Sequence, residues 1–216
     1  MVMTALITII AAYLIGSINF AVIFAKVFLK KDVRELGSGN AGATNVMRNA
    51  GFLPGALTFV CDALKGFVAS FLGLKMFEYI SHYEDGDWAR GIYGALICGV
   101  ACMLGHVFPI FFGFKGGKGV ATSVGIFAVC NPLAITLGLI AFAIVLATTK
   151  LVSLSSLVAT VIVVILSIAL GDFVYADLLP QAILIIIMGA IVFLKHKSNI
   201  ERLIAGTESK IGKKGK

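Results

Sequence analysis

The stretch GVATSVGIFAVCNPLAITLGLIAFAIVLATT, residues 119–149, is uncharged over 31 residues and contains Asn131 and Pro132 near its middle. As one α-helix it would be about 46 Å long, whereas the hydrocarbon core of a bilayer is about 30 Å thick. It is therefore either one strongly tilted span or two short helices broken at Asn131-Pro132. This choice decides how many times the chain crosses a membrane.

The rest of the chain is also strongly apolar. Its 216 residues are 59% hydrophobic and 13% charged, with a mean hydropathy of +1.02, which excludes an ordinary soluble domain. Backbone polar groups in lipid must be satisfied within the protein, and the alternation typical of barrel strands is absent, so an α-helical bundle is expected. The other uncharged or mostly apolar stretches are 1–25, 52–77, 91–114, 151–171 and 178–194.

The positions of the charged residues decide between six and seven spans, because cytoplasmic loops are enriched in Lys and Arg. With two short helices in 119–149, almost all Lys and Arg fall on one side, including Lys150 and the tail 195–216. With one helix, Lys150 and the tail would move outside. We therefore predict an all-α integral membrane protein, a single membrane domain over 1–216. It is a seven-transmembrane-helix bundle with an extracytoplasmic N-terminus and a short basic cytoplasmic tail. The predicted outer side receives Glu78, Glu84, Asp85, Asp87, Asp172 and Asp177.

The net charge of +7 follows from this cationic cytoplasmic rim. Such a rim attracts anionic lipid head groups and concentrates anionic solutes. Nucleic acid is a poor alternative partner, because the charges lie at the ends of membrane helices.

A glycine-rich polar segment, GSGNAGATNVMR, occupies residues 37–48 after the first apolar stretch. Its glycines allow a concave arrangement of backbone N–H groups, and Arg48 adds a cation with bidentate reach, which together predict an anion cradle for phosphate. The segment contains GxGxxG but follows a membrane helix, so a dinucleotide fold is excluded while phosphate binding is not. A flexible connector is the alternative. The candidate phosphate ligands are Gly37, Ser38, Gly39, Asn40, Gly42, Thr44, Asn45 and Arg48.

A second polar segment, GHVFPIFFGFKGGKGVAT, covers residues 105–122 on the same predicted side. Two lysines flank a glycine pair that lets the backbone approach a ligand, and a helix beginning just beyond would add its dipole. By themselves, these lysines could equally anchor to lipid head groups. The candidate phosphate ligands are Lys115, Gly116, Gly117, Lys118, Gly119 and Thr122.

The third polar segment, KHKSNIERLIAGTESK, covers residues 195–210. His196 and Asn199 are three residues apart, so a helix would place them on one face. Histidine can move protons or donate to phosphate near neutral pH. The alternative is a solvated helix with a basic face at the membrane surface.

Asp62 and Lys65 lie about ten residues into the second apolar stretch, where charges are normally paired or functional. Their i,i+3 spacing predicts a structural ion pair. No metal site is predicted, because the histidines form no HxxxH or HExxH pattern and no His–carboxylate pair is evident on the cytoplasmic side. His82 and Asp87 have the spacing of one glycerolipid acyltransferase class but belong to the predicted outer side. Cys61, Cys98, Cys102 and Cys130 fall in apolar stretches without a CxxC pair, which predicts buried thiols.

Together with GSIN at 16–19 and DALKG at 62–66, the three polar segments resemble the bacterial acyl-phosphate:glycerol-3-phosphate acyltransferase family. The resemblance covers nearly the whole chain. It implies a multi-pass enzyme of the cytoplasmic (inner) membrane with seven helices and a cytoplasmic active site. Such an enzyme transfers an acyl chain to the 1-hydroxyl of glycerol 3-phosphate, giving lysophosphatidate and phosphate, the first acylation of phospholipid synthesis. Asn19 and Ala41 stand where relatives often have Pro. The residues that match the family's functional positions are Ser38, Arg48, Lys118, His196 and Asn199.

The expected partners are acyl phosphate, glycerol 3-phosphate and membrane lipids, with no cofactor, metal or obligate protein partner. Acyl phosphate is an activated mixed anhydride, so positioning and charge stabilisation could suffice for catalysis. We expect the donor's own phosphate to take the hydroxyl proton, with His196 donating a hydrogen bond to phosphate; a neutral His196 acting as base is the alternative. The competing function is an organophosphate or phosphate transporter, which should show inverted repeats. A lipid-binding scaffold would not need so many glycines.

Overall fold

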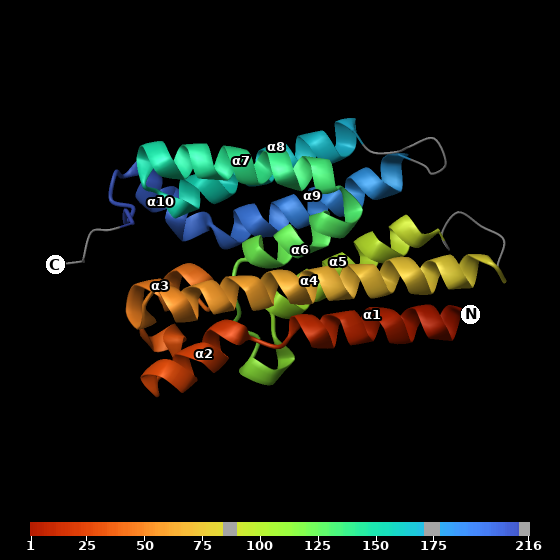
Figure 1. Ribbon diagram of the computed structural model, residues 1–216, viewed down its shortest axis with the longest axis horizontal. Helices are drawn as coiled ribbons and strands as arrows, with labels where there is room; N and C mark the ends of the chain where they lie inside the picture. Colours follow the sequence, from red (N-terminus) through yellow and green to blue (C-terminus); the bar gives the residue numbers. More distant parts are fainter. Residues whose placement is uncertain (84–89, 171–177, 212–216) are drawn as a thin grey trace.

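The computed structural model describes residues 1–83, 90–170 and 178–211. Within these ranges all regular secondary structure is helical, as predicted, and most helices run along one long axis (Figure 1). The elements are α1 (Val2–Gly16), α2 (Phe20–Leu29), η1 (Val33–Glu35), α3 (Ala43–Ala50), α4 (Phe52–Ser81), α5 (Gly91–Val107), η3 (Ile110–Phe112), α6 (Val120–Cys130), α7 (Pro132–Thr149), α8 (Val152–Ala169), α9 (Leu178–Lys195) and α10 (Lys197–Ile204).

Five helical stretches of the described chain are long and apolar enough to cross a membrane. A sixth is obtained if α9 and α10, which are bent by 58°, count as one broken span. The 11-residue α6 is about 16 Å long and cannot cross the hydrocarbon core alone. The protein is therefore an all-helical bundle with five or six candidate spans, which are Val2–Leu29, Phe52–Ser81, Gly91–Phe112, Pro132–Thr149, Val152–Ala169 and the bent pair.

The uncharged stretch 119–149 is two helices. α6 ends at Cys130 and α7 begins at Pro132, and the side chain of Asn131 caps α7 by accepting a hydrogen bond from Ala134 N at 3.0 Å. Proline is well tolerated at the first helical position, because its missing N–H would have no intrahelical partner there. The predicted break at Asn131-Pro132 is thus present.

The first apolar stretch contains a second break, which periodicity did not reveal. α1 ends at Gly16 and α2 begins at Phe20, with the Asn19 side chain capping α2. The carbonyl oxygen of Ile18, inside the break, accepts a 2.7 Å hydrogen bond from Lys65 Nζ on α4. A buried charge therefore satisfies backbone that the helix interruption leaves open.

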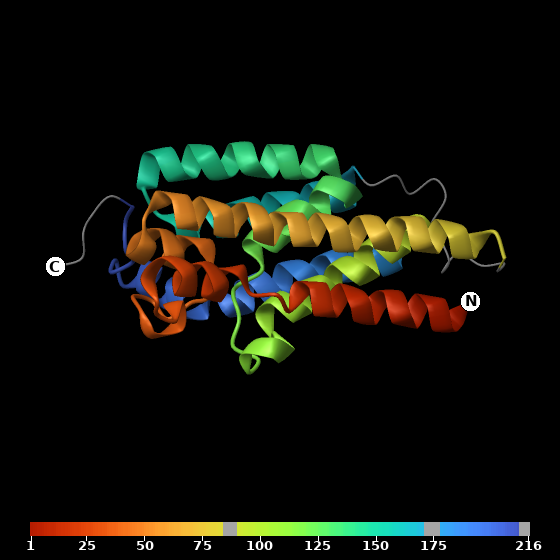
Figure 2. The same cartoon turned by 60° about the horizontal axis from the view of Figure 1, so that its bottom comes forward.

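The long helix α4 packs against α1, α5 and α6. Small residues allow these backbones to approach closely: a Cβ at Gly73 would overlap the backbone of Gly94, and one at Gly125 would overlap that of Ala63. A second group of helices, α7 to α9, lies beside α6 in both cartoon views (Figures 1 and 2). Apolar side chains of α5 to α9 form the shared core, including Leu96, Met103, Ile126, Ile135, Val163 and Met188.

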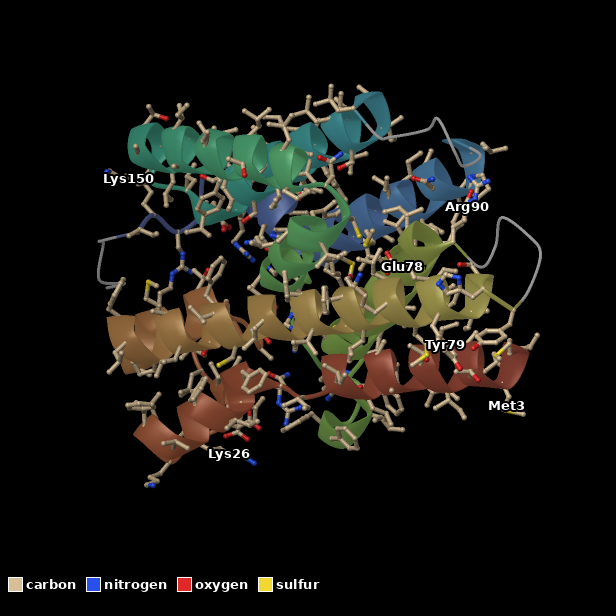
Figure 3. All side chains as sticks on the ribbon, turned by 45° about the vertical axis from the view of Figure 1, so that its right-hand side comes forward. Met3, Lys26, Glu78, Tyr79, Arg90 and Lys150 are labelled. Atoms are coloured by element: carbon tan, nitrogen blue, oxygen red, sulfur yellow. The ribbon has the colours of Figure 1, made fainter. Side chains whose placement is uncertain are left out.

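The two ends of the bundle differ in charge and in structure. Lys26 and Lys150 lie at one end, and Met3, Tyr79 and Arg90 lie at the other (Figure 3). The short helices α2, α3 and α10 gather at the end that carries Lys150 (Figure 1). This basic end holds the candidate site. Several acidic residues that we predicted for the opposite side lie outside the described residues, namely Glu84, Asp85, Asp87, Asp172 and Asp177.

Candidate active site

A polar cavity of about 840 Å³ lies at the basic end of the bundle. All three polar segments of the sequence line it, together with parts of α4, α5 and α8. Four cationic side chains among the lining residues suit it to anionic ligands: Arg48, Lys118, Arg202 and Lys210. The five residues that match the family's functional positions also line this cavity: Ser38, Arg48, Lys118, His196 and Asn199.

Asn45 shapes the first polar segment. Its buried side-chain amide donates to the carbonyl oxygens of Val33, Leu36 and Asn40 at 2.9–3.1 Å, and its Oδ1 accepts from Ser38 N at 3.2 Å. Asn45 lines the cavity, but these bonds occupy both ends of its amide. Its visible role is therefore to fold the loop that presents Ser38.

Arg34 ties the first polar segment to the second. Its guanidinium makes two hydrogen bonds to the Asp32 carboxylate, at 3.0 and 2.8 Å, and donates to the Phe112 carbonyl oxygen at 2.6 Å. The hydrogen bond from Arg34 lowers the pKa of Asp32 below its ordinary value, although partial burial opposes the shift. The bidentate pair fixes the guanidinium within its own loop, and the hydrogen bond to Phe112 joins that loop to the second polar segment.

Lys118 and Asn199 bring the second and third segments together. The Lys118 ammonium donates a hydrogen bond to Asn199 Oδ1. Burial lowers the pKa of Lys118 to about 8, with Glu208 opposing the shift and Arg202 and Arg48 adding to it. A bound anion would restore the charged state of this amine.

Glu208, in the tail after α10, organises this part of the cavity. Its Oε1 accepts hydrogen bonds from Ser153 Oγ at 2.9 Å and Asn199 Nδ2 at 2.7 Å, and its Oε2 accepts from Arg202 Nε at 2.7 Å. Burial alone would raise the pKa of Glu208, but these three donors lower it below its ordinary value. The ionised carboxylate therefore orients Asn199 toward Lys118.

The tail also covers one side of the cavity. Arg48 Nη2 donates to the Ser209 carbonyl oxygen at 3.1 Å, and Ile211 N donates to the Lys150 carbonyl oxygen at 2.9 Å. These bonds join the tail to α3 and to the α7–α8 connection. The cavity wall is thus assembled from both ends of the described chain.

His196 is neutral near pH 7. It is buried, and burial together with the nearby charge of Lys118 lowers its pKa to about 4. Its Nδ1 lies 2.8 Å from the Val192 carbonyl oxygen, which can only accept, so Nδ1 carries the hydrogen. The Nε2 atom is then a hydrogen-bond acceptor, which differs from the donor role that we expected toward phosphate.

Six further predicted phosphate ligands line the cavity, and five do not. Lys115 is exposed, and Thr122 is buried against Gly66. Gly39 adopts a φ of +68° and turns the first loop. The lining ones are Gly37, Asn40, Gly42, Thr44, Asn45 and Gly119; the others are Gly39, Lys115, Gly116, Gly117 and Thr122.

Gly116 and Gly117 hold the second segment against α5. Their N–H groups donate to the carbonyl oxygens of Val107 and His106 at 3.2 and 3.1 Å. A Cβ on Gly117 would overlap His106 Nε2, so only glycine leaves room for the imidazole. These glycines place the neighbouring Lys118 rather than line the cavity themselves.

The structure brings together a His–carboxylate pair that the sequence did not reveal. His106 Nδ1 lies 3.5 Å from Asp62 Oδ1, and both residues line the cavity. Lys65 Nζ lies 2.8 Å from the same carboxylate oxygen, at the predicted i,i+3 spacing. The pair is 44 positions apart in the chain, so no local spacing marks it. A charge inside one apolar helix and a histidine at the end of another were the available signals.

Other cavity residues escaped notice for related reasons. Ser153 and Ser156 lie on the apolar helix α8, and Arg202 and Glu208 belong to the third polar segment, in which only His196 and Asn199 were predicted as site residues. His82 is exposed at the far end of α4, and Asp87 lies outside the described residues. Among the side chains that the structure describes, no group of three or more His, Cys, Asp or Glu could hold a metal ion.

A second, almost wholly apolar groove adjoins the polar cavity and runs between α4, α6, α7, α8 and α9. Phe59, Val120, Phe142 and Ser156 line both spaces, so the two lie side by side. Along α8 the groove extends from Ser156 to Val164, about 12 Å of helix. The combined space therefore offers a cationic end and a long apolar end.

Comparisons with known proteins agree with one another. A family model described as Glycerol-3-phosphate acyltransferase matches residues 6–206. The glycerol-3-phosphate acyltransferase of Thermoanaerobacter sp. (strain X514) is 43% identical over 215 residues, 98% of each chain. Glycerol-3-phosphate acyltransferase 2 of Bacillus anthracis is 40% identical over 206 residues, 95% of this chain and 98% of the relative.

Two solved structures share the fold. One is a crystal structure of PlsY (YgiH), described as an integral membrane glycerol 3-phosphate acyltransferase, in its glycerol 3-phosphate form. It has a TM-score of 0.83 and 36% identity, covering 96% of both chains. The lysophosphatidic acid form of the same protein has a TM-score of 0.80 and 36% identity, covering 96% of this chain and 95% of the other.

Proposed function

This chain belongs to the glycerol-3-phosphate acyltransferase family, and we propose that it uses acyl phosphate to acylate the 1-hydroxyl of sn-glycerol 3-phosphate. The products are lysophosphatidate and phosphate, which makes this the first acylation of phospholipid synthesis. The relatives are acyltransferases, and the solved PlsY structures are a glycerol 3-phosphate form and a lysophosphatidic acid form. The transporter alternative is therefore set aside.

We base the choice of donor on the shared wall of the cationic cavity and the apolar groove, four residues of which line both spaces. An acyl phosphate has a dianionic head and a long hydrocarbon tail joined at one carbonyl carbon. Bound across Phe59, Val120, Phe142 and Ser156, it would place its phosphate among the cations and its chain in the groove. The carbonyl would then lie where the two spaces meet, next to an acceptor held by its own phosphate.

We assign the phosphate groups to the cationic side chains and to the first loop. Arg48 offers a planar fork for one phosphate, and Lys118 offers a point charge whose lowered pKa a dianion would raise. Asn199, held by Glu208, and the polar groups of Ser38 complete the set. Two dianions bind together only where several cations offset their repulsion, and this cavity provides four.

The chemical step needs no covalent enzyme intermediate. The 1-hydroxyl oxygen attacks the carbonyl carbon, a new C–O ester bond forms, and the bond from that carbon to the phosphate oxygen breaks. The hydroxyl proton passes to an oxygen of the departing phosphate, whose second pKa is about 6 for a monoester. The donor thus supplies both the leaving group and the base, and the enzyme supplies position and charge.

His196 fits this scheme as a neutral partner. Because Nδ1 donates to the Val192 carbonyl, Nε2 would accept a hydrogen bond from a substrate hydroxyl or a protonated phosphate. Donation to phosphate from Nε2 would require a second proton on the ring, which the buried site disfavours. The neutral imidazole therefore orients a substrate proton rather than neutralising a phosphate charge.

We further infer a single membrane domain with seven spans, in which α1–α2 and α9 count as one each and α6 crosses together with the non-helical segment 113–119 that precedes it. The basic end would face the cytoplasm and the N-terminus would lie outside, in a bacterial inner membrane. The clustering of Lys26 and Lys150 at the end that holds the cavity supports this orientation (Figure 3). Both substrates would then reach the cavity from the cytoplasm and the inner leaflet.

An assay of the purified protein in detergent tests the donor. Radiolabelled glycerol 3-phosphate should give lysophosphatidate with palmitoyl phosphate, with undiminished rate in EDTA, and give little with palmitoyl-CoA. The thioester offers no phosphoryl group next to its carbonyl to take the proton. Equal rates with palmitoyl-CoA, or activity lost to chelation and restored by a divalent ion, would contradict the proposal.

A further inference from the structure

Three charged or ionisable side chains form a buried cluster between α4 and α5. Asp62, Lys65 and His106 are 1%, 4% and 4% exposed. Asp62 Oδ1 lies 2.8 Å from Lys65 Nζ and 3.5 Å from His106 Nδ1. Burying such a cluster in a membrane helix bundle is unfavourable. Residues of this kind therefore normally have a structural or chemical role.

Lys65 has a structural use. Its ammonium donates to the Ile18 carbonyl oxygen in the break between α1 and α2, and it lies 5.7 Å from the centre of the Phe20 ring. Lys65 does not line the polar cavity, although Asp62 and His106 do. Lys65 therefore supports the fold, whereas Asp62 and His106 line the cavity.

His106 retains unused hydrogen-bonding capacity at the cavity wall. Its Nδ1 lies 3.5 Å from Asp62 Oδ1, which is long for a hydrogen bond, and no shorter partner for Nδ1 is found among the described residues. Polar atoms as deeply buried as this are normally satisfied by protein, water or ligand. A ligand group in the cavity could supply what the protein does not.

The position of the pair matches the reacting end of the acceptor. Phe59 lies one helical turn before Asp62 on α4 and lines both the cavity and the groove. His106 lies under Gly117, next to Lys118. Asp62 and His106 thus line the cavity close to one residue that it shares with the apolar groove and to the glycine that precedes Lys118.

The side chains of Asp62 and His106 are poor partners for the phosphate of the acceptor and good partners for its hydroxyl groups. A carboxylate repels phosphate, whereas carboxylate oxygens and imidazole nitrogens are good partners for hydroxyl groups. Granting the proposed function, we propose that Asp62 and His106 form the subsite for the glycerol hydroxyl groups of the acceptor. They hold the 1-hydroxyl toward the acyl carbonyl while the cations hold the phosphate.

Binding measurements on the purified full-length protein test whether Asp62 and His106 bind the hydroxyl groups while the cations bind the phosphate. The ligands are glycerol 3-phosphate, 3-hydroxypropyl phosphate, which lacks the 2-hydroxyl, and ethyl phosphate, which has none. In Asp62→Asn and His106→Gln, the affinity for glycerol 3-phosphate should fall by about tenfold to a hundredfold, the usual effect of removing a hydrogen bond to a charged or buried group. The affinity for ethyl phosphate should change by less than about twofold, within the spread of remote surface substitutions.

Two controls keep the result interpretable. Glu78→Gln makes the same chemical change on α4 in the exposed pair with Lys75, and it should bind all three ligands as the wild type does. Because Asp62→Asn leaves Lys65 without its partner, the double variant Asp62→Asn/Lys65→Met removes the stranded charge and should show the same selective loss.

The outcomes separate the two claims. Equal loss of glycerol 3-phosphate and ethyl phosphate in all the Asp62 and His106 variants would mean that the pair only supports the fold, and would overturn the inference. Unchanged binding of both ligands would also overturn it. If the wild type makes no lysophosphatidate from palmitoyl phosphate, the proposed function itself fails.

Discussion

Lys118 should set the alkaline limit of the enzyme. Since burial lowers its pKa to about 8, its ammonium is charged in most molecules at pH 7 and in only about a tenth of them at pH 9. A neutral amine is a weak partner for phosphate. We therefore expect kcat/KM for glycerol 3-phosphate, which reports the free enzyme, to fall about tenfold between pH 7 and pH 9.

Two changes at this position test the assignment. Arginine stays charged throughout this range, so the remaining activity of Lys118→Arg should lack the alkaline decline even if its magnitude is low. Lys118→Cys alkylated with 2-bromoethylamine carries a lysine analogue of lower pKa, and its decline should move to lower pH.

The assay follows initial rates of lysophosphatidate formation with both substrates well below saturation, so that the rate reports the unoccupied cavity, and each rate is corrected for spontaneous hydrolysis of the donor at that pH. Lys31→Arg, a change at an exposed lysine, is the matched control and should keep the wild-type profile. An identical alkaline decline in Lys118→Arg, or a wild-type rate that stays level to pH 9, would refute the reasoning.

Three further outcomes follow from the site and the bundle. Arg48→Ala should weaken binding of glycerol 3-phosphate by about 2–4 kcal/mol, measured calorimetrically, and Arg48→Lys should fail nearly as badly if the contact is bidentate. Gly138→Leu fills the apolar groove beside Val163 and should shift the preferred acyl phosphate to shorter chains, whereas Ala143→Leu on the exposed side of α7 should not; an unchanged chain-length profile would place the chain elsewhere. In a cysteine-free background, Tyr83→Cys should react with an impermeant maleimide on intact cells and Ser209→Cys should not; the reverse pattern would overturn the orientation.

The sequence anticipated those parts of the site that depend on charge placement in an apolar chain. Arg48, Lys118 and His196 were predicted because three polar segments share one side of the membrane and resemble those of a known family, and all three residues line the cavity. The break at Asn131-Pro132 was predictable from length and charge asymmetry together. The break before Asn19 was not, because the lysine that satisfies it comes from a different helix.

What escaped prediction depends on contacts between distant residues. Asn45 has a side chain that could bind phosphate, but its amide nitrogen donates to three backbone carbonyl oxygens of its own loop. In the sequence, Glu208 is one charge in a polar tail, whereas in the structure it accepts hydrogen bonds from three side chains on two helices, α8 and α10. The Asp62–His106 pair exists only once α4 and α5 are packed. None of these roles has a local signature.

The tail after α10 has a consequence for biosynthesis. The ribosome delivers the chain from its N-terminus, and early segments fold first. The loop that carries Ser38 and the helix that carries Arg48 are made long before Glu208 and Ser209, which close the cavity and orient Asn199. A nascent or truncated chain that ends before the tail would hold a membrane bundle with Arg48, Lys118 and Arg202 in place, but it would lack Lys210 and one wall of the cavity. The segment after α10 must therefore be made before this wall of the cavity can form and before Glu208 can orient Asn199.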